Sequence, residues 1–243
     1  MDYTKFEPLL GSWGEHLRPF IESKECDEIY AKLKADSSKG ITICPNSADT
    51  YRVFATTPFK RTKVVFMLQD PYPWVKNGRV LADGIAMSCR NTGIIQPSLE
   101  KFYEAIEDTQ PNGSELKKYR KADLAHLSLQ GCMMLNTALT VEKDKPSSHS
   151  LLWRPFTKFL LEDTFARFKE EVIFVLCGAE SQYFEKFINP LQHRIFKLEH
   201  PANAARKLRK WEHDNIFNKI NKLLQSYGKD PIVWSDDLPF RKV

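Results

Sequence analysis

The sequence lacks an apolar run long enough to cross a membrane, since none approaches the ~20 residues that a spanning helix needs. It also lacks the apolar core of a secretory signal in its first residues, Met1 to Glu7. These two absences predict an intracellular protein that acts in the cytoplasm of a bacterium or of a virus's host cell, with the nucleus left open.

Cysteine is scarce and scattered. The chain has five cysteines, an odd number, and no two of them are spaced as a CxxC pair or stand at zinc-ligand spacing from a histidine. We therefore expect reduced and mostly buried thiols, no metal site and no dissociable cofactor.

The sequence also has no internal repeat, low-complexity tract or linker. Its 243 residues, 42% of them hydrophobic, suit one domain over residues 1–243 with an ample core and a short extra tail at about 235–243. The net charge of +5 is compatible with a polyanionic partner but is not diagnostic of one.

Four short apolar runs predict buried strands, because each is rich in β-branched or aromatic residues and has few polar breaks. They cover residues 63–68, 132–136, 172–177 and 194–199. Helical patterns separate them, which is typical of α/β proteins. We predict a three-layer α/β/α sandwich around a central four-stranded, mainly parallel sheet.

The helices are predicted from apolar spacing and from capping residues. Residues 12–35 are expected to form a helix that Pro19 divides or begins, and Ser98 is expected to cap a second helix. The segment from Pro73 to Gly78 is expected to be a loop. Further helices are predicted at 123–130, 155–169, 179–187 and 214–225.

Polar side chains or glycine follow each predicted strand. The runs end near Asp70, Asn136, Gly178 and His200. The carboxyl ends of parallel strands meet at one edge of a sheet, where ligands bind in open α/β folds. Taken alone, Asp70 could also be a solvated residue at a strand exit. An acid, an amide and an imidazole that converge on one edge predict a binding or catalytic site.

Five segments stand out as motifs: LQDPYP at 68–73, QPSLEK at 96–101, MLNTALTV at 134–141, SSH at 147–149 and HPANAA at 200–205. In the same order they resemble GQDPYH, PPSLEN, LLLNTVLTV, NSH and HPSPLS, the motifs of family-1 uracil-DNA glycosylases. The order and spacing agree from about Trp13 to Trp234. Each motif is weak by itself, but together, on the predicted strands, they are specific.

The resemblance implies a DNA repair enzyme that flips uracil out of the helix, hydrolyses its N-glycosidic bond and leaves an abasic site. Asp70 would hold the attacking water, and His200 would donate to uracil O2 as a neutral imidazole. The amide of Asn136 matches uracil N3–H and O4 but mispairs with cytosine. Tyr72 would exclude the thymine methyl group, and Gln69 and Met87 complete the expected base-binding set.

The resemblance also implies the residues that contact DNA. Pro97, Ser98, Gly178 and Ala202 occupy the family's phosphate-binding positions, and Arg206 begins a basic segment, 206–210, that we favour for further phosphate contacts. A second basic segment, 117–121, is better interpreted as a solvated face.

Four positions depart from the family pattern. Pro73 replaces a histidine, Met87 replaces the stacking phenylalanine, Ala179 replaces a serine, and Ala204 stands where a leucine wedge fills the gap left by the flipped base. A thioether covers a base less rigidly than a ring. Ala204 is too small for a wedge, so we expect either that Leu208 replaces it or that there is none.

Three alternatives remain open from the sequence. The chain could be a non-catalytic DNA-binding or replication-associated protein on the glycosylase fold, or a glycosylase for a modified pyrimidine. An unrelated nucleotide-binding protein is disfavoured, since the first strand is not followed by a glycine-rich phosphate loop. The expected partners are single- or double-stranded DNA and a proteinaceous glycosylase inhibitor, and the chain is expected to be a monomer.

Overall fold

The computed structural model describes residues 2–110 and 113–235. The tail expected at 235–243 therefore lies outside the described residues, apart from Ser235. One hydrophobic cluster links buried side chains from Phe6 to Trp234. We propose on this basis that the described residues form a single domain.

The central sheet has four parallel strands in the order β5–β2–β7–β8. Their bounds are β2 (Val64–Leu68), β5 (Cys132–Asn136), β7 (Ile173–Cys177) and β8 (Arg194–Leu198). Every residue of β2, β5 and β7 is buried, whereas the edge strand β8 is partly exposed. All four predicted strands are confirmed, and the sheet they form is wholly parallel.

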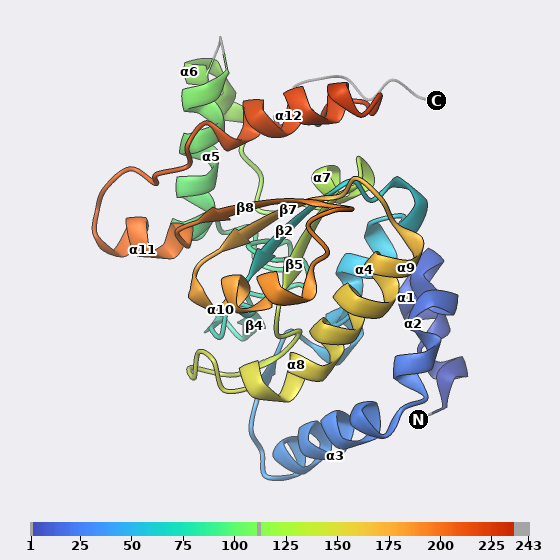
Figure 1. The fold of residues 1–243 in the computed structure, drawn as a ribbon. Coiled ribbons are helices and arrows are strands. Elements are labelled where there is room, and N and C mark those ends of the chain that lie inside the picture. The colour runs from blue at the N-terminus through green and yellow to red at the C-terminus, as the bar shows by residue number, and fades with distance from the viewer. Residues whose placement is uncertain (1, 111–112, 236–243) are drawn as a thin grey trace.

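Helices cover both faces of the sheet (Figure 1), which confirms the predicted three-layer sandwich. On one face, Phe66 of β2 packs against Phe102 of α5 and Phe217 of α12, with ring centroids 5.5 and 6.3 Å apart. On the other face, Phe174 of β7 packs against Phe165, which follows α8, at 5.2 Å. Aromatic pairs at these distances add to the energy of area burial.

The α-helices, with the turns that extend them, have these bounds: α1 (Glu7–Leu10), α2 (Gly14–Ile21), α3 (Lys24–Ser38), α4 (Arg52–Thr56), α5 (Pro97–Thr109), α6 (Gly113–Leu116), α7 (Ala125–Leu129), α8 (Ser150–Phe159), a π-helical turn (Leu160–Phe165), α9 (Ala166–Phe168), α10 (Ala179–Gln182), a 3₁₀ helix (Tyr183–Phe187), α11 (Pro201–Arg206) and α12 (Ile216–Ser226). Helices predicted at 123–130, 179–187 and 214–225 are confirmed as α7, α10 with its 3₁₀ extension, and α12.

Three predictions of helix boundaries were wrong. Pro19 lies inside α2, and the chain breaks later, where the Ser23 hydroxyl caps α3 by accepting a hydrogen bond from the Cys26 N–H at 3.2 Å. The helix predicted from residue 155 begins at Ser150, so that Pro155 lies in its interior. Ser98 does not cap α5, because Gln96 holds that position and Ser98 lies in the first turn.

Two short antiparallel pairs flank the main sheet. The strands β1 (Ile43–Cys44) and β6 (Val141–Glu142) pair with each other, and β3 (Val75–Lys76) and β4 (Arg79–Val80) form a hairpin. The hairpin turn has positive φ at both Asn77 (51°) and Gly78 (72°), a conformation that Asn-Gly favours. The segment expected as a loop therefore contains ordered strands.

Candidate active site

The carboxyl edge of the sheet brings the predicted site residues together. Asn136 is the last residue of β5 and pairs in register with Leu68, two residues before Asp70. Gly178 follows β7 directly, and its N–H donates to Leu198 O at 2.9 Å, which places His200 beside it. In Figure 1 this edge lies on the left, where α10, α11 and β4 are grouped.

Asp70 is held by the loop that joins β6 to α8. Its Oδ2 accepts a hydrogen bond from the Ser147 N–H at 2.5 Å. Burial raises the pKa of Asp70, and this hydrogen bond opposes the rise. A carboxylate with one oxygen fixed and a raised pKa is suited to orient a water molecule and accept its proton.

Gln69 shares the same anchor. Its side-chain amide donates to the Ser147 hydroxyl at 2.7 Å. Its backbone carbonyl accepts from the Thr137 hydroxyl at 2.8 Å and from the Ala138 N–H at 3.0 Å. The side chain of Gln69 is therefore directed to Ser147. Ser147 was not among the predicted site residues. Its inclusion in the SSH motif was the available signal, but its positive φ of 67° was not predictable from it.

Asn136 is buried with only 6% of its surface exposed. Across residues 2–110 and 113–235, no hydrogen bond to its side-chain amide is found. The amide therefore keeps its acceptor and both donors for a ligand at the strand end. A buried polar group without a partner costs about 1–3 kcal/mol, so a ligand of matching pattern is favoured over a mismatched one.

Tyr72 is fixed from two sides. Its hydroxyl lies 2.6 Å from the Ser98 hydroxyl, and its ring stacks on Trp74 with centroids 6.0 Å apart and planes 26° from parallel. Burial raises the pKa of Tyr72, so its hydroxyl stays protonated. Ser98 is itself buried, and this hydrogen bond occupies the hydroxyl that was expected to face DNA.

Met87 lies in an irregular segment between β4 and α5. It is buried and has a φ of 62°. The buried carboxylate of Asp83 organises this segment by accepting from the Ser88 hydroxyl and the Arg90 N–H, both at 2.7 Å, and by pairing with Arg52 at 3.0 Å. The position of Met87 therefore depends on a buried ionic network.

His200 is the N-cap of α11, and its Nδ1 accepts a hydrogen bond from the Ala202 N–H at 3.1 Å. A neutral imidazole with an accepting Nδ1 carries its proton on Nε2. Burial and the nearby Arg206 lower the pKa of His200 to about 4. His200 is therefore a neutral donor at physiological pH, which agrees with the role that the resemblance implied.

Gly178 is needed for the approach of His200. Its φ is +91°, and a Cβ added to it would lie 3.0 Å from the Cβ of His200. A larger residue would be strained and would push the imidazole away from the edge.

The residues expected to contact DNA differ in exposure. Ala204 is fully buried, so its methyl group does not face DNA, and this predicted contact needs correction: α11 begins directly after His200 and turns Ala204 inward. Leu208 is 92% exposed, with a φ of 51° in the turn after α11. Pro97 and Arg206 are exposed, and Ala202 is partly exposed.

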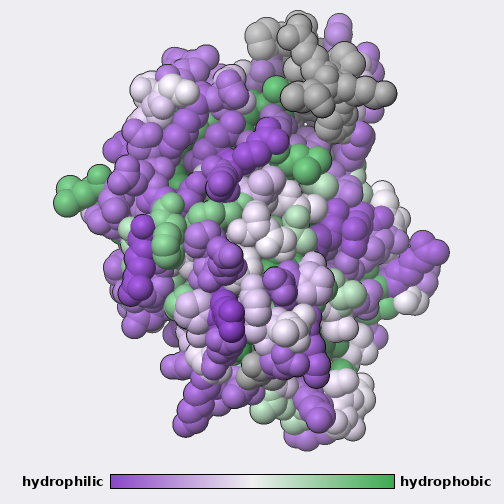
Figure 2. All heavy atoms as spheres, turned by 90° about the vertical axis from the view of Figure 1, so that its right-hand side faces the viewer, coloured by the Kyte–Doolittle hydropathy of each residue, from purple (hydrophilic) through white to green (hydrophobic). Residues whose placement is uncertain are grey.

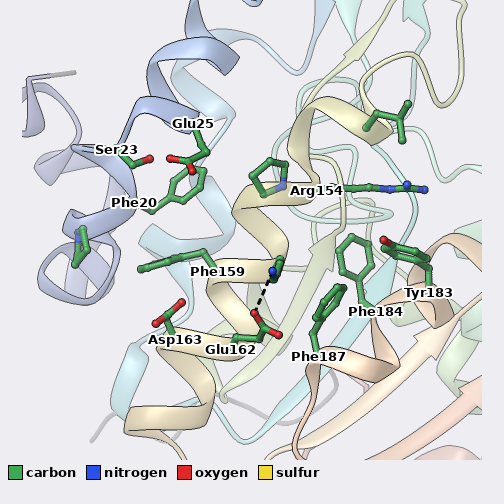
Figure 3. Close-up of a pocket in the computed structure, with 14 residues that line it drawn as sticks. Phe20, Ser23, Glu25, Arg154, Phe159, Glu162, Asp163, Tyr183, Phe184 and Phe187 are labelled. Carbon is green, nitrogen blue, oxygen red and sulfur yellow. Dashed lines mark ion pairs between the residues drawn. The ribbon is translucent and has the colours of Figure 1, made fainter.

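A cavity of about 570 Å³ lies apart from these residues. Figure 3 shows it along α8, with Phe20 of α2 on one side and Tyr183 and Phe187 of the 183–187 helix on the other. None of the predicted site residues lines it. Figure 2 views the side of the molecule away from the carboxyl edge, and the surface there is mostly hydrophilic with small apolar patches.

One group of candidate metal ligands is found in the described part of the chain: Asp36, Glu142 and His149. Both carboxylates already pair with lysines, Asp36 with Lys32 and Glu142 with Lys145. These ion pairs neutralise the acidic charge that would attract a cation.

The parallel sheet, with a carboxylate, an amide and a neutral imidazole at its carboxyl edge, defines an α/β/α enzyme with a ligand site at the strand ends. Comparison with known proteins gives the family. The model of the uracil DNA glycosylase superfamily matches residues 54–225. The chain belongs to this superfamily, as its motifs predicted.

Curated relatives cover nearly the whole chain. The uracil-DNA glycosylase of Pseudomonas aeruginosa is 32% identical over 232 residues, which span 93% of this chain and 94% of the relative. That of Proteus mirabilis is 32% identical over 93% of this chain and 96% of its own length.

Solved structures support the fold. Mimivirus uracil-DNA glycosylase superposes with a TM-score of 0.82 at 23% identity, covering 96% of this chain and 89% of its own. A single-residue variant of the mimivirus enzyme, solved in complex with UGI, gives 0.81 at 25% identity, covering 93% and 89%.

Proposed function

We propose that this chain excises uracil from DNA in base-excision repair, with Asp70 and His200 as its catalytic residues. It is a monofunctional glycosylase that hydrolyses the N-glycosidic bond and leaves an abasic site. The observation behind the residue assignment is that the parallel sheet brings the Asp70 carboxylate, bound by the Ser147 N–H, and the His200 imidazole, whose Nδ1 accepts from the Ala202 N–H, to the same edge.

The two residues suit the charges of the reaction. Breaking the bond leaves positive charge on the sugar and negative charge on the pyrimidine. The Asp70 carboxylate orients water and stabilises the cationic sugar. The Nε2–H of His200 donates to uracil O2 as negative charge develops there.

Base recognition rests on Asn136 and the residues around it. The free amide of Asn136 pairs with N3–H and O4 of uracil, whereas cytosine would leave buried polar groups unpaired. The ring of Tyr72 restricts bulk at C5, and Met87 covers the base. Gln69 supports this pocket through Ser147 and the backbone after Asn136.

DNA is held at the same edge. Flipping a base costs a few kcal/mol, which contacts to the backbone and pocket offset. Pro97, Gly178, Ala202 and Arg206 are the positions proposed for phosphate contacts. Ser98 contributes through its backbone and its hydrogen bond to Tyr72.

We also propose that the chain acts as a monomer and is open to a protein inhibitor such as the one bound to the mimivirus enzyme. We propose that it acts inside the cell, in the cytoplasm of a bacterium or of a virus's host, with the nucleus as an alternative, because its substrate class is DNA. No helix among the described residues is long and apolar enough to span a bilayer.

A non-catalytic DNA-binding protein is the second candidate, and the buried Ala204 favours it, because no leucine wedge stands at that position. Incubating the protein with uracil-containing single- and double-stranded oligonucleotides, then cleaving abasic sites with alkali, separates the two. We expect cleavage. Tight DNA binding without cleavage at any enzyme concentration would favour the second candidate.

We expect Leu208→Ala to lower uracil release from duplex DNA about tenfold and from single strands less than twofold. Leu208 is exposed in the turn after α11, close in sequence to His200 and Ala202, and only a duplex has a gap to fill after flipping. Single-turnover rates on matched single and double strands provide the measurement.

Thermal unfolding is the control for Leu208→Ala, since an exposed side chain contributes little to stability. Equal losses on both substrates would show that Leu208 is not the wedge.

The opposite design, Ala204→Leu, is expected to destabilise the protein by overpacking a buried site instead of improving duplex activity.

A further inference from the structure

The hairpin β3–β4 lies at the rim of the candidate active site. It begins three residues after Tyr72, and Leu81 N–H donates to Trp74 O at 3.0 Å to close it. Asp144 N–H donates to Pro73 O at 2.8 Å, which ties the hairpin base to the loop that holds Asp70. The hairpin is thus fixed relative to the catalytic edge.

The inner face of the hairpin is apolar. Val75 and Val80 pack with Cys44 and Val141 of the β1–β6 pair. Side chains alternate along a strand, so Lys76 and Arg79, which are cross-strand partners, lie on the opposite face, and both are exposed.

The charges on that outer face are not compensated. Residues 73–82 contain no aspartate or glutamate. Within residues 2–110 and 113–235, neither Lys76 nor Arg79 forms an ion pair, and Arg79 makes only a 3.5 Å hydrogen bond to Asn91 O. Two cations are therefore available to an anionic partner.

Trp74 adds an aromatic surface. It is 46% exposed, although its ring stacks on Tyr72, which is in turn bonded to Ser98 of α5. One face of a rigid ring pair is thus open to solvent beside the base-binding residue Tyr72. Aromatic rings flanked by cations are typical of surfaces that bind single-stranded nucleic acid.

We propose that Trp74, Lys76 and Arg79 bind the DNA strand next to the excised nucleotide. A neighbouring base stacks on Trp74, and Lys76 and Arg79 pair with the phosphates that flank it. This inference rests on the proposed function, since it assumes that the flipped nucleotide enters beside Tyr72. It supplies DNA contacts that the buried Ala204 cannot.

The test measures binding of a uracil-free single-stranded oligonucleotide by fluorescence anisotropy, which does not depend on catalysis. We expect Trp74→Ala to weaken binding about tenfold and Trp74→Phe to retain most of it. Phe168→Ala is the matched control, because Phe168 is an exposed aromatic (55%) in α9, far from the carboxyl edge.

The charge contribution is tested by salt dependence. Lys76→Gln with Arg79→Gln should reduce the slope of log affinity against log salt by about 1.4, the value for two phosphate contacts on a single strand. The control, Lys34→Gln with Lys222→Gln, removes two exposed charges on α3 and α12.

Unchanged affinity in Trp74→Ala, or equal slope changes in the two double variants, would overturn the inference. Failure of the proposed function gives a different result: the wild-type protein would bind the oligonucleotide through Trp74 and release no uracil.

Discussion

Asp70→Asn is expected to lower the rate of uracil release about a thousandfold. The amide keeps the shape of the side chain, and its oxygen can still accept from the Ser147 N–H. It cannot accept a proton from water or favour the cationic sugar. The loss should therefore fall on the chemical step, measured as the single-turnover rate on a uracil-containing single strand, while DNA affinity changes little.

The pH profile adds a second readout for Asp70. Because burial raises the pKa of this carboxyl, the active, ionised form is lost as pH falls through a value above that of an ordinary aspartate. We expect the wild-type rate to show this acidic limb and the residual rate of Asp70→Asn to lack it. A rate equal to wild type in Asp70→Asn would remove Asp70 from the mechanism.

Ser147→Gly is the matched control for the anchor of Asp70. Glycine keeps the N–H that binds Asp70 and tolerates the φ of 67°, but loses the hydroxyl that binds Gln69. We expect the rate of uracil release to fall less than tenfold. Such a result would show that Asp70 depends on the backbone N–H of Ser147 and not on its hydroxyl.

The strands, and the sheet edge at which the candidate site residues meet, could be predicted from the sequence because their signals are local. Buried parallel strands are short apolar runs, and each candidate residue lies at most two positions beyond the end of its strand. Once the sheet is parallel, Asp70, Asn136 and His200 must reach one edge. The role proposed for His200 comes from its motif, whereas its tautomer could be assigned only from the hydrogen bond that the Ala202 N–H donates to Nδ1.

The residues proposed to contact DNA could not be predicted in the same way, because the exposure of their side chains depends on tertiary packing. Ala204 was placed at the wedge position because it aligns with the leucine of the HPSPLS motif, yet its burial depends on how α11 packs against α5. Ser98 was expected to be a cap and a DNA contact, but Tyr72 occupies its hydroxyl. The hairpin that presents Trp74 depends on two left-handed residues, Asn77 and Gly78.

His200→Gln is expected to lower the rate of uracil release about a hundredfold, within the range for removing one donor to a developing anion. The glutamine amide can donate but cannot hold the position of Nε2, which the Ala202 N–H fixes through Nδ1. His200→Ala removes the donor entirely and should lose at least as much. Comparable rates in His200→Ala and wild type would show that leaving-group stabilisation comes from elsewhere.

The pH dependence separates the function of His200 from its effect on stability. In the folded protein the pKa of His200 is about 4, below the ordinary value of 6.5. The contribution of His200 to stability is therefore complete above pH 6.5 and is lost progressively as the pH falls towards 4, because the unfolded chain binds the proton first. His193 has the same lowered pKa but lies near the amino end of the sheet, where its Nδ1 accepts from the Val172 N–H at 3.4 Å.

His193→Gln is therefore the matched control. Both glutamine variants should show a weaker loss of urea resistance between pH 6.5 and 4, because each removes one histidine that protonates more readily when unfolded. Only His200→Gln should lose activity at pH 7. If His193→Gln lost as much, the effect of His200→Gln would reflect a disturbed fold, and donation from His200 to the departing base would have no support.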